Sequence, residues 1–556
     1  MRKIFWIFFL LIFYSLAYSQ EKDLEFNFDI NSKTSTLPKI FYPSIDLSGR
    51  GYHSDVSWPY HLASKETFSR WQAEIGFARG IYRLYFNLWE IEQLKSDPFL
   101  KSAIFSHYEK IIKNISDSGG TVLLVLYGTP AGWAEVLDKR APPHNFKDWQ
   151  SFIEGLIRYF SCQKRYNIWY EIWSSPESEN FFLGTKRDYL NLYEIVARAV
   201  KKIKNETKIS IPVGGPGSSW WFQNFGGNTI FSPEKSLIYE LIRFCKQKDL
   251  PLDFISWHAF SCDPAIEKEF TIYKKIPAQL IRDWLEYFRL DKNIPLIITE
   301  WNYDAGSNWS EERSERSYMV ASFIPLRLKN MFEADINYQV YFCLEDFQNN
   351  KEGLNINRGV FSYSKYNPLL SNAKSIYNVF LFLSYLGNKF FGVFSLDDFV
   401  GVLATRKDTE IIILIWNYID PYLGRNFIFR NLTELSERDK RILAQLFKSL
   451  KLDQIIEEKI PLDNSLGSEK LKFLFKKAKE LNRRANLFKN KKRNLKIKFL
   501  NLKGDYLYQR YSVNNQCSWD CPFLPLEEKI INAENIYEES IELNPYSVEL
   551  VILKKE

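Results

Sequence analysis

The chain has 556 residues, of which 46% are hydrophobic and 25% are charged. This balance is that of an ordinary globular protein and excludes a disordered chain, a collagen and a multi-span membrane protein. The net charge of +7 is too small to argue for nucleic-acid binding, and six cysteines exclude a disulfide scaffold. Aromatic residues make up 17%, which suits the stacking of sugar rings but also fits a general drift in composition.

The first twenty residues have the pattern of a secretory signal peptide. Two basic residues follow the initial methionine, residues 4–18 are almost wholly apolar, and Ala17-Tyr18-Ser19 is a small-x-small cleavage site. The apolar run is shorter than the roughly 20 residues that a membrane-spanning helix needs. We therefore expect cleavage before Gln20 and an exported protein that is periplasmic, on the cell surface or secreted. An uncleaved membrane anchor is the alternative.

From about residue 36 to 386, short β-branched or aromatic runs alternate with longer amphipathic stretches. The short runs predict strands at Ile40–Ile45, Ile81–Phe86, Thr121–Tyr127, Ile168–Trp173, Ile209–Val213, Leu252–His258, Pro295–Thr299 and Ile336–Leu344. Helical patterns lie between them, as at Phe146–Phe160 and Arg187–Ile203, and a final helix is expected near Leu369–Leu386. Buried strands that alternate with helices indicate a parallel sheet, and eight such units indicate a (β/α)8 barrel. A doubly wound open sheet is the alternative, but no glycine-rich phosphate loop follows the first strand.

From about residue 390 the pattern changes to that of a β-sandwich. Strands are predicted at Val400–Thr405, Glu410–Trp416, Leu495–Leu500, Asp505–Tyr511 and Ser547–Leu553. A charged, helical insertion at about residues 433–489 interrupts these strands, and Cys517 and Cys521 are spaced closely enough for a local disulfide. We therefore expect a signal peptide at 1–19, a barrel at 20–388 and a β-sandwich domain at 389–556.

Polar residues that end barrel strands are the candidates for an active site, because in such barrels the site lies at the C-terminal ends of the strands. Strand two carries Arg83, strand four runs into Trp173-Ser174-Ser175, strand six ends at His258, and strand seven ends in Glu300-Trp301-Asn302. Glu300 is the sharpest candidate, since a carboxylate at the end of an apolar strand beside tryptophan suits a nucleophile for a sugar. A strand-end ion pair is the alternative for Glu300, and a structural histidine is the alternative for His258.

Several segments occur in the order found in one enzyme family. They are Trp149 to Tyr166, Trp169-Tyr170-Glu171-Ile172-Trp173, Phe181-Phe182, Val213-Gly214-Gly215-Pro216, Asp253 to His258, Thr299-Glu300-Trp301-Asn302, Asp346 and Leu543 to Val548. Together they resemble glycoside hydrolase family 39, the β-xylosidase and α-L-iduronidase group of barrel-type retaining glycosidases. The resemblance covers about residues 36–420 and resumes near 495–553. It implies a carbohydrate substrate, two catalytic carboxylates about 5–5.5 Å apart, and neither a metal nor an organic cofactor.

The resemblance also implies roles for individual residues. Glu300 stands at the position of the nucleophile, and Arg83 lies beside it as a cation that keeps the carboxylate ionised. His258 would orient the substrate or the nucleophile. Contacts with the sugar are further expected from Trp173, Ser174, Trp301 and Asn302.

The carboxylic acid that protonates the leaving group is missing from its expected position. The family reads Trp-Asn-Glu-Pro after strand four, whereas this chain reads Trp173-Ser174-Ser175-Pro176, so Ser175 stands in place of the acid. A serine hydroxyl is not a useful general acid near neutral pH, and loss of that function costs about 10²–10⁴ in rate for unactivated leaving groups. Glu177 or Glu179, in the loop after strand four, is a candidate for a substitute acid.

Three other positions bear on the chemistry. Tyr85 stands where strand two of the family often has His, and Phe260 stands where strand six has Tyr. Glu171 lies about 13 Å deeper than Ser175 at ~3.3 Å per residue, so we expect it to form a structural ion pair in the barrel. Replacements near the sugar on a retained scaffold favour lost or altered catalysis.

Three functions are consistent with these features. The first is an exported retaining β-glycosidase of the xylosidase type, with altered acid catalysis. The second is a catalytically inactive, glycan-binding barrel that uses Trp173, Trp301, Trp220 and Trp221, although the last two also fit core packing. The third is a secreted protein-interaction module built on the helical insertion. None of the three calls for a nucleic-acid partner or for a membrane span after signal cleavage.

Overall fold

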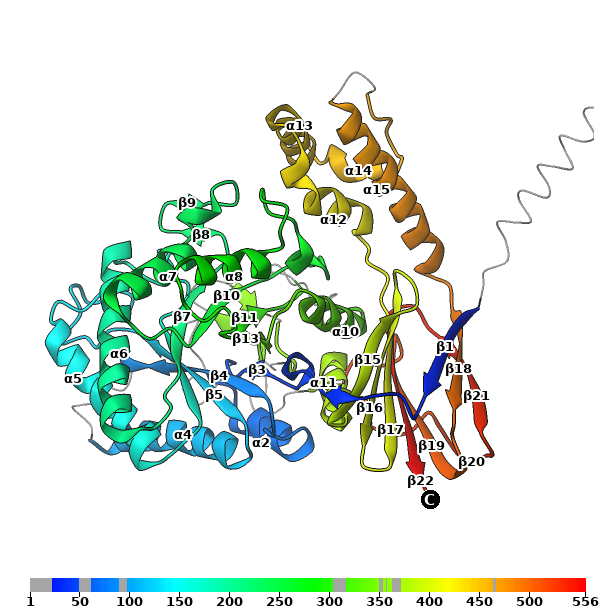
Figure 1. The fold of residues 1–556 in the computed structure, drawn as a ribbon, viewed down its shortest axis with the longest axis horizontal. Helices are drawn as coiled ribbons and strands as arrows, with labels where there is room; N and C mark the ends of the chain where they lie inside the picture. Colours follow the sequence, from blue (N-terminus) through cyan, green and yellow to red (C-terminus); the bar gives the residue numbers. More distant parts are fainter. Residues whose placement is uncertain are drawn as a thin grey trace, which may run out of the picture.

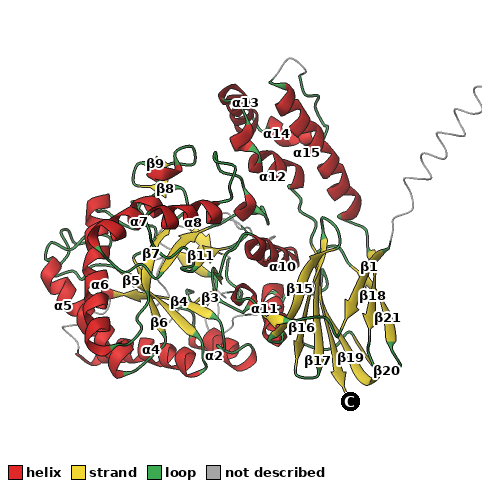
Figure 2. Ribbon diagram, viewed as in Figure 1, coloured by secondary structure: helices red, strands yellow, loops and turns green. Residues whose placement is uncertain are grey.

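The computed structural model describes residues 23–49, 62–89, 98–303, 317–349, 354–356, 358–362, 372–463 and 467–556. A β/α barrel and a β-sandwich lie side by side, and a bundle of helices projects from the sandwich domain next to the barrel (Figures 1 and 2). This arrangement confirms the fold class predicted from the sequence. The predicted signal peptide at 1–19 lies outside the described residues.

Eight parallel strands form the closed barrel, and they neighbour one another in chain order. They are β3 (Ile45–Asp46), β4 (Ile81–Asn87), β5 (Thr121–Tyr127), β6 (Ile168–Ile172), β7 (Val213–Ser218), β10 (Phe254–His258), β11 (Leu296–Trp301) and β12 (Tyr338–Tyr341). Every residue of β4, β7, β10 and β11 is buried, because one face of each strand lines the barrel interior and the other is covered by helices. The C-terminal ends of these strands therefore meet at one end of the barrel.

The first barrel strand is shorter than the sequence predicts. The segment Ile40–Ile45 was expected to be a strand, but Lys39–Phe41 forms a short 3₁₀ helix and only Ile45–Asp46 pairs with the barrel. Pro43 separates the two, and a proline cannot donate a hydrogen bond to a strand ladder. Asp46 consequently lies at the end of a barrel strand.

Helices surround the barrel on its outside (Figure 2). They are α2 (Lys65–Glu74), α4 (Pro98–Asp117), α5 (Phe146–Ile157), α6 (Lys186–Thr207), α7 (Leu237–Lys248), α8 (Pro277–Tyr287), α10 (Ser317–Glu333) and α11 (Ser375–Tyr385). The start of α6 shows how the sequence sets such a helix, because Thr185 and Asp188 form a reciprocal capping box there. The predicted final helix near Leu369–Leu386 corresponds to α11, although residues 369–371 lie outside the described residues.

The β-sandwich consists of a seven-stranded and a three-stranded sheet. The first has the order β2 (Ser35–Thr36), β15 (Lys389–Ser395), β16 (Val400–Lys407), β17 (Glu410–Asn417), β22 (Ser547–Lys555), β19 (Gly504–Val513) and β20 (Glu527–Ala533). The second has the order β1 (Leu24–Asp29), β18 (Arg493–Leu500) and β21 (Ile536–Leu543). The sequence places residues 20–388 in the barrel, whereas the structure places β1 and β2 in the sandwich. Phe26 and Phe28 of β1 explain the difference, because both are buried in the core between the two sheets.

The helical insertion consists of α12 (Leu423–Arg430), α13 (Glu437–Lys448), α14 (Lys451–Ile456) and α15 (Glu469–Phe488), which share their own apolar core. It begins at Leu423, earlier than the predicted residue 433, because Ile428 of α12 belongs to that core. The insertion also contacts the barrel. Thr433 Oγ1 donates a hydrogen bond to the Phe270 carbonyl at 2.6 Å, and the Lys440 ammonium lies 4.1 Å from the ring centre of Phe231.

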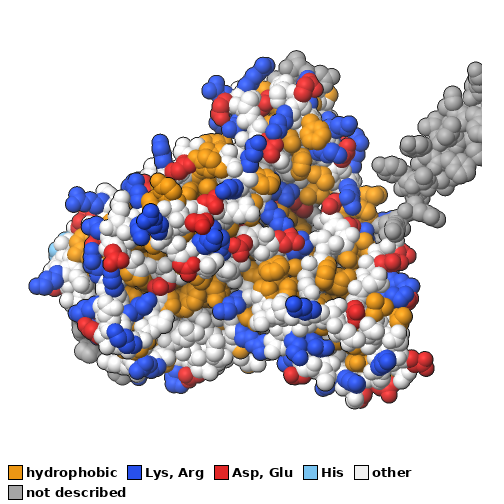
Figure 3. Space-filling view, in the orientation of Figure 1, with side chains coloured by type: hydrophobic (Ala, Val, Ile, Leu, Met, Phe, Trp, Pro, Cys, Tyr) orange, Lys and Arg blue, Asp and Glu red, His pale blue; other side chains and the backbone are white. Residues whose placement is uncertain are grey.

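The surface carries charges of both signs. Figure 3 shows Lys and Arg side chains interspersed with Asp and Glu over the visible face of all three parts. Cys517 and Cys521 form a disulfide in the loop between β19 and β20. Within the ranges that the structure describes, no helix has the length and apolar character needed to cross a bilayer.

Candidate active site

A buried arginine organises the carboxyl groups at the C-terminal end of the barrel. Arg83 on β4 forms ion pairs with Glu300 on β11, with Asp46 on β3 (Nη1–Oδ2, 3.2 Å) and with Glu171 on β6 (Nη2–Oε2, 2.8 Å). The side chain of Arg83 is fully buried, so these carboxylates compensate the cost of removing its charge from water. Three carboxyl groups around one guanidinium group leave the cluster rich in negative charge.

The two oxygens of Glu300 have different surroundings. Oε1 accepts hydrogen bonds from Arg83 Nη1 and from the Tyr85 hydroxyl, the latter at 2.6 Å. Oε2 lies 3.6 Å from His258 Nδ1. Burial raises the pKa of Glu300, but His258, Arg83 and the hydrogen bond from Tyr85 together lower it below its usual value. Glu300 is therefore ionised at neutral pH, as a nucleophile must be.

His258 lies between Glu300, the candidate nucleophile, and Ser175, which stands where the resemblance predicts an acid. Its Nδ1 lies 3.3 Å from Ser175 Oγ as well as 3.6 Å from Glu300 Oε2. Burial lowers the pKa of His258, so its imidazole is neutral near pH 7. Its Nε2 is buried and has no hydrogen-bond partner among the described residues.

The chain turns sharply after β6, where the resemblance places Ser175 at the position of the family's acid. Trp173 and Ser175 have φ values of 67° and 43°, in the left-handed region that residues other than glycine rarely adopt. The Ser175 N–H donates to the Gly217 carbonyl at 2.7 Å, which fixes the turn against the end of β7. Ser174 Oγ accepts a hydrogen bond from Arg83 Nη2 at 3.1 Å, so this turn brings both serines to the cluster around Glu300.

Three other residues that were predicted to contact the sugar are hydrogen-bonded to groups of the protein itself. The Trp173 indole N–H donates to the Phe181 carbonyl at 3.0 Å, and the Trp301 indole N–H donates to Gln339 Oε1 at 2.7 Å. The Asn302 amide donates to two loop carbonyls. All three side chains are fully buried. Their binding of a sugar stays a prediction, while packing and loop anchoring are what the structure shows.

The two candidates for a substitute acid differ in environment. Glu177 Oε1 accepts hydrogen bonds from the Ser219 N–H at 2.7 Å and from the Ser219 hydroxyl. Glu177 Oε2 is buried without a hydrogen-bond partner among the described residues, and burial raises the pKa of this carboxyl. Glu179 is exposed instead. A raised pKa is what a general acid needs, so Glu177 is the better candidate of the two.

Two residues of the cluster did not stand out in the sequence. Asp46 was missed because the first strand was predicted to stop at Ile45; burial raises the pKa of Asp46 to about 6, against the nearby Arg83 charge. Tyr85 was noted only as a departure from the family pattern, yet its hydroxyl contacts Glu300 directly. Among the described residues, no group of three or more His, Cys, Asp or Glu side chains is arranged to hold a metal ion.

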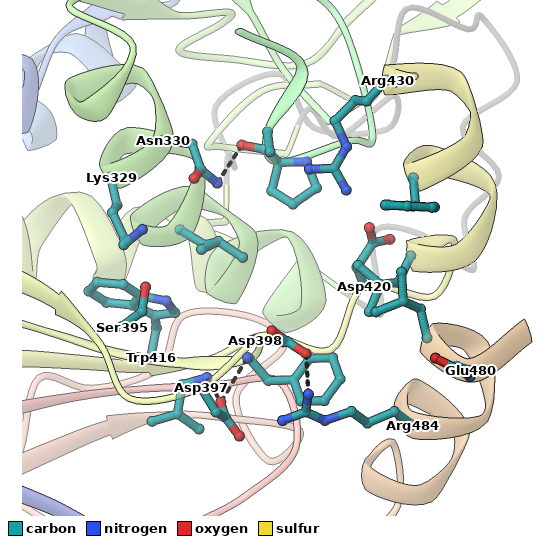
Figure 4. A pocket seen from close by; sticks show the side chains of 18 of the residues that line it. Lys329, Asn330, Ser395, Asp397, Asp398, Trp416, Asp420, Arg430, Glu480 and Arg484 are labelled. Carbon is teal, nitrogen blue, oxygen red and sulfur yellow. Dashed lines mark hydrogen bonds and ion pairs between the residues drawn. The ribbon is translucent and has the colours of Figure 1, made fainter. Parts of the chain in front are cut away.

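A cavity of about 630 Å³ lies elsewhere, where the barrel helix α10, the β15–β16 turn and the helices α12 and α15 meet (Figure 4). Charged side chains at its wall are paired with one another or with neighbours. Arg484 binds Asp398 at 2.6 Å, Lys329 of α10 binds Glu333 at 2.8 Å, and Arg430 lies 3.3 Å from Asp263. The pairs of Arg484 and Arg430 join the insertion to the sandwich and to the barrel, whereas the pair of Lys329 lies within α10. The cavity walls do not include the cluster around Glu300.

A comparison with protein-family models decides the family. The model for glycosyl hydrolases family 39 matches residues 74–470, which is more than half of the chain. The chain belongs to glycosyl hydrolases family 39. Its match begins just before β4 and ends in the helical insertion, so it includes the strands that carry Arg83 and Glu300.

Two curated relatives are xylosidases by name. A β-xylosidase of Geobacillus stearothermophilus is 24% identical over 299 residues, which are 50% of this chain and 53% of that protein. A β-xylosidase of Caldicellulosiruptor saccharolyticus is 28% identical over 170 residues, 29% of this chain and 31% of that protein. The chain therefore aligns with about half of the length of the first relative and with less of the second.

Solved structures share the fold over nearly the whole chain. A glucosidase from Croceicoccus marinus superposes with a TM-score of 0.64, at 13% identity, and the match covers 96% of this chain and all of that one. A monomeric β-xylosidase from Caulobacter crescentus CB15 gives a TM-score of 0.60, at 13% identity, with 96% and 99% of the two chains covered. At this identity the likeness establishes the arrangement of barrel and sandwich.

Proposed function

We propose that this protein is an exported retaining β-glycosidase of the xylosidase type, with Glu300 as its nucleophile. The observation that carries the proposal is the environment of Glu300 at the C-terminal end of β11. An ionised carboxylate there has one oxygen fixed by Arg83 and Tyr85, and a second oxygen that only approaches His258. Family membership and the named xylosidase relatives support a β-xyloside as the first substrate to test.

The mechanism has two displacement steps. Oε2 of Glu300 attacks the anomeric carbon, a glycosyl ester forms, and the bond to the leaving oxygen breaks. The leaving oxygen departs as an anion or takes a proton from an acid. A water molecule then attacks the same carbon and loses a proton to a base, while the ester bond breaks and returns Glu300 as a carboxylate. Arg83 stabilises the free carboxylate before the first step and again after the second.

The first step lacks its usual acid at Ser175. Glycosides whose leaving group is stable as an anion do not require protonation, so they should react fastest. For other substrates, Glu177 is the proposed proton donor, because burial keeps its pKa raised and it lies in the loop that follows Ser175. Ser175 and the buried, neutral His258 would then shape the space beside the leaving group.

A catalytically inactive, glycan-binding barrel is the second candidate. The observation in its favour is the serine at the acid position, where Ser175 contacts His258 and no carboxyl group is among its hydrogen-bond partners in the described residues. This candidate predicts that glycans bind without turnover, even when the leaving group needs no protonation.

Export is part of the proposal. It is supported by the signal-peptide pattern of the first twenty residues and by the Cys517–Cys521 disulfide, because disulfides persist in oxidising compartments. Expression of the full chain with a C-terminal tag, followed by fractionation and N-terminal sequencing, tests it. The proposal expects a mature N-terminus near Gln20 outside the cytoplasm; an intact N-terminus in the cytoplasmic fraction contradicts it.

The catalytic test uses the purified mature protein and 2,4-dinitrophenyl β-xyloside, with and without azide. Dinitrophenolate leaves without protonation, so an active Glu300 should give a burst of dinitrophenolate. Azide should speed turnover if the general base is absent, since it attacks the glycosyl-enzyme without needing one. Fast turnover without azide that is lost in Glu177→Gln, but kept in the matched Glu179→Gln variant, identifies Glu177 as the substitute acid/base, because the acid of the first step acts as the base of the second. Glycan binding with no burst on any sugar supports the inactive barrel instead.

A further inference from the structure

Two hydroxyl groups connect Arg83 to the nucleophile. The Tyr85 hydroxyl lies 2.6 Å from Glu300 Oε1, 2.8 Å from Ser174 Oγ and 3.0 Å from Arg83 Nη1. Ser174 Oγ lies 3.1 Å from Arg83 Nη2. Tyr85 and Ser174 are 4% and 0% exposed, so water does not compete for these contacts. Both positions also differ from the family segments that the chain resembles, yet here they contact each other.

Counting donors gives these contacts a single direction. A guanidinium group only donates hydrogen bonds, an ionised carboxylate only accepts them, and a hydroxyl has one hydrogen to give. The hydrogen of Tyr85 must therefore go to Glu300. The contact between Tyr85 and Ser174 then requires Ser174 to be the donor, and Ser174 in turn accepts from Arg83. The result is a directed chain from Arg83 through Ser174 and Tyr85 to Glu300.

We propose that Tyr85 is a positioning residue for the nucleophile, with its hydroxyl directed by Ser174, which rests on the function proposed above for Glu300. The hydrogen bond holds Oε1, so Oε2 is the oxygen left to meet the anomeric carbon. It also favours the carboxylate over the carboxylic acid, because a protonated Oε1 could not accept from both Tyr85 and Arg83 without losing part of its charge-assisted bonding. Tyr85 and Ser174, which both differ from the family pattern, would thus act together to position Glu300.

The proposal also concerns the second chemical step. Glu300 leaves the anomeric carbon as a carboxylate, and its negative charge develops on both oxygens as the ester bond breaks. A donor already aimed at Oε1 stabilises that charge without reorganisation. Removing the Tyr85 hydroxyl should therefore slow hydrolysis of the glycosyl-enzyme, whereas the loss of positioning of Oε1 should slow its formation less. With an activated substrate this appears as a lower kcat together with a lower KM, because the intermediate accumulates.

Other groups around Glu300 must be kept constant in the test. Those that face it are Arg83 on the same strand as Tyr85, His258 on β10, Asp46 on β3 and, across Arg83, Glu171 on β6. Burial raises the pKa of Asp46 to about 6 and lowers the pKa of His258, so both groups contribute to a pH profile. A change of Tyr85 to Phe leaves the contacts of these four groups with one another in place. A difference between wild type and this variant is therefore assigned to the lost hydroxyl.

The decisive variant is Tyr85→Phe, with Tyr82→Phe as its matched control. Tyr82 lies on the same strand and is equally buried, but its hydroxyl donates to the Gly76 carbonyl at 3.2 Å, away from the site. We expect Tyr85→Phe to shift the acidic limb of the pH profile of kcat/KM for 2,4-dinitrophenyl β-xyloside to higher pH, by about one pH unit. Tyr82→Phe should leave that limb unchanged. Ser174→Ala should shift it in the same direction by less, and should add little in the Tyr85→Phe background.

A measurement that needs no turnover separates this proposal from the proposed function. Titration of ¹³C-carboxyl-labelled glutamate by NMR, with the Glu300 signal assigned from its loss in Glu300→Gln, reports the protonation of Glu300 directly. A higher titration midpoint in Tyr85→Phe than in wild type and Tyr82→Phe supports the proposal even if no glycoside is hydrolysed. An unchanged midpoint, with a folded variant shown by its circular dichroism melting curve, overturns it.

Discussion

The nucleophile side and the acid side of the proposed catalytic centre differ in the polar groups that they offer. On the nucleophile side, Glu300 has two hydrogen bonds on Oε1 and a buried arginine that also binds two other carboxylates. On the acid side, Ser175 sits in a left-handed turn with only a hydroxyl to offer, 3.3 Å from His258. The comparison shows that Glu300 can have a complete set of partners while the end of β6 offers no carboxyl group at Ser175, because each barrel strand supplies its own residues.

The largest expected effect comes from removing the nucleophile. Glu300→Gln keeps the size of the side chain but eliminates the attacking carboxylate, so turnover of 2,4-dinitrophenyl β-xyloside should fall by on the order of 10⁴-fold or more. Steady-state kinetics measures this loss, and a thermal melt checks that the protein is folded. Activity within tenfold of wild type would show that another residue attacks the sugar.

Restoring a carboxyl at the altered side should give the next largest effect. Ser175→Glu introduces an acid at the position where the family has one, and should raise hydrolysis of an unactivated methyl or sugar β-xyloside by about 10²–10⁴-fold. Dinitrophenyl substrates should gain far less, because their leaving group needs no proton. Ser175→Gln is the control, since it has the same shape and no proton to give. Equal rates of hydrolysis of the unactivated β-xyloside in the two variants would contradict the view that only the acid is missing.

Ser174 predicts a smaller difference between substrates. Its hydroxyl hydrogen is directed to Tyr85 and its oxygen accepts from Arg83, so it offers no donor to a sugar's 2-hydroxyl group. Hydrogen bonds to that hydroxyl supply several kcal/mol in the transition state of many glycosidases. We expect 2-deoxy and parent dinitrophenyl β-xylosides to have kcat/KM values within about tenfold, after correction for their rates of spontaneous hydrolysis. A loss of about a thousandfold or more for the 2-deoxy substrate would show that another group binds the 2-hydroxyl.

The smallest effect lies in the β-sandwich and should leave catalysis unchanged. Burial raises the pKa of Glu549 to about 7, although Ser512 donates a hydrogen bond to it. The folded state therefore holds this proton more tightly than the unfolded chain, and stability is lost as pH rises from about 4.5 through 7. Glu549→Gln should remove that loss, so its melting temperature should rise relative to wild type by about 1–2 °C at pH 8 but not at pH 4.5. A difference of equal size at both pH values contradicts this assignment.

Local patterns were enough to predict much of the barrel. The run Thr121–Tyr127 is a strand with the predicted bounds, since glycines stand directly before and after an unbroken apolar segment. Strand β1 could not be found in this way, because Leu24 pairs with Leu495 and no short-range signal reports a partner so far along the chain. The start of the first barrel strand after Pro43 could not be predicted either, because it depends on the pairing of Ile45 with Tyr82 on the next strand.

The site was predictable to the extent that strand ends meet. The family resemblance placed Arg83 beside Glu300, and their ion pair forms because the closed barrel brings β4 and β11 to the same interior. The contact between Tyr85 and Ser174 could not be expected, because it depends on the sharp turn after β6 and on the directions of two hydroxyl groups. The environment of Glu177 was likewise hidden, since Ser219 lies in a different loop.

A covalent intermediate on Glu300 would test the proposed role of this residue most directly. The protein is incubated with 2,4-dinitrophenyl 2-deoxy-2-fluoro-β-xyloside, whose fluorine slows hydrolysis of the glycosyl-enzyme, and is then analysed by mass spectrometry after peptic digestion. We expect one added fluoroxylosyl group on the peptide that contains Glu300, formed more slowly in Tyr85→Phe and not at all in Glu300→Gln. An intact, unmodified Glu300 peptide, or an adduct on another residue, would contradict it.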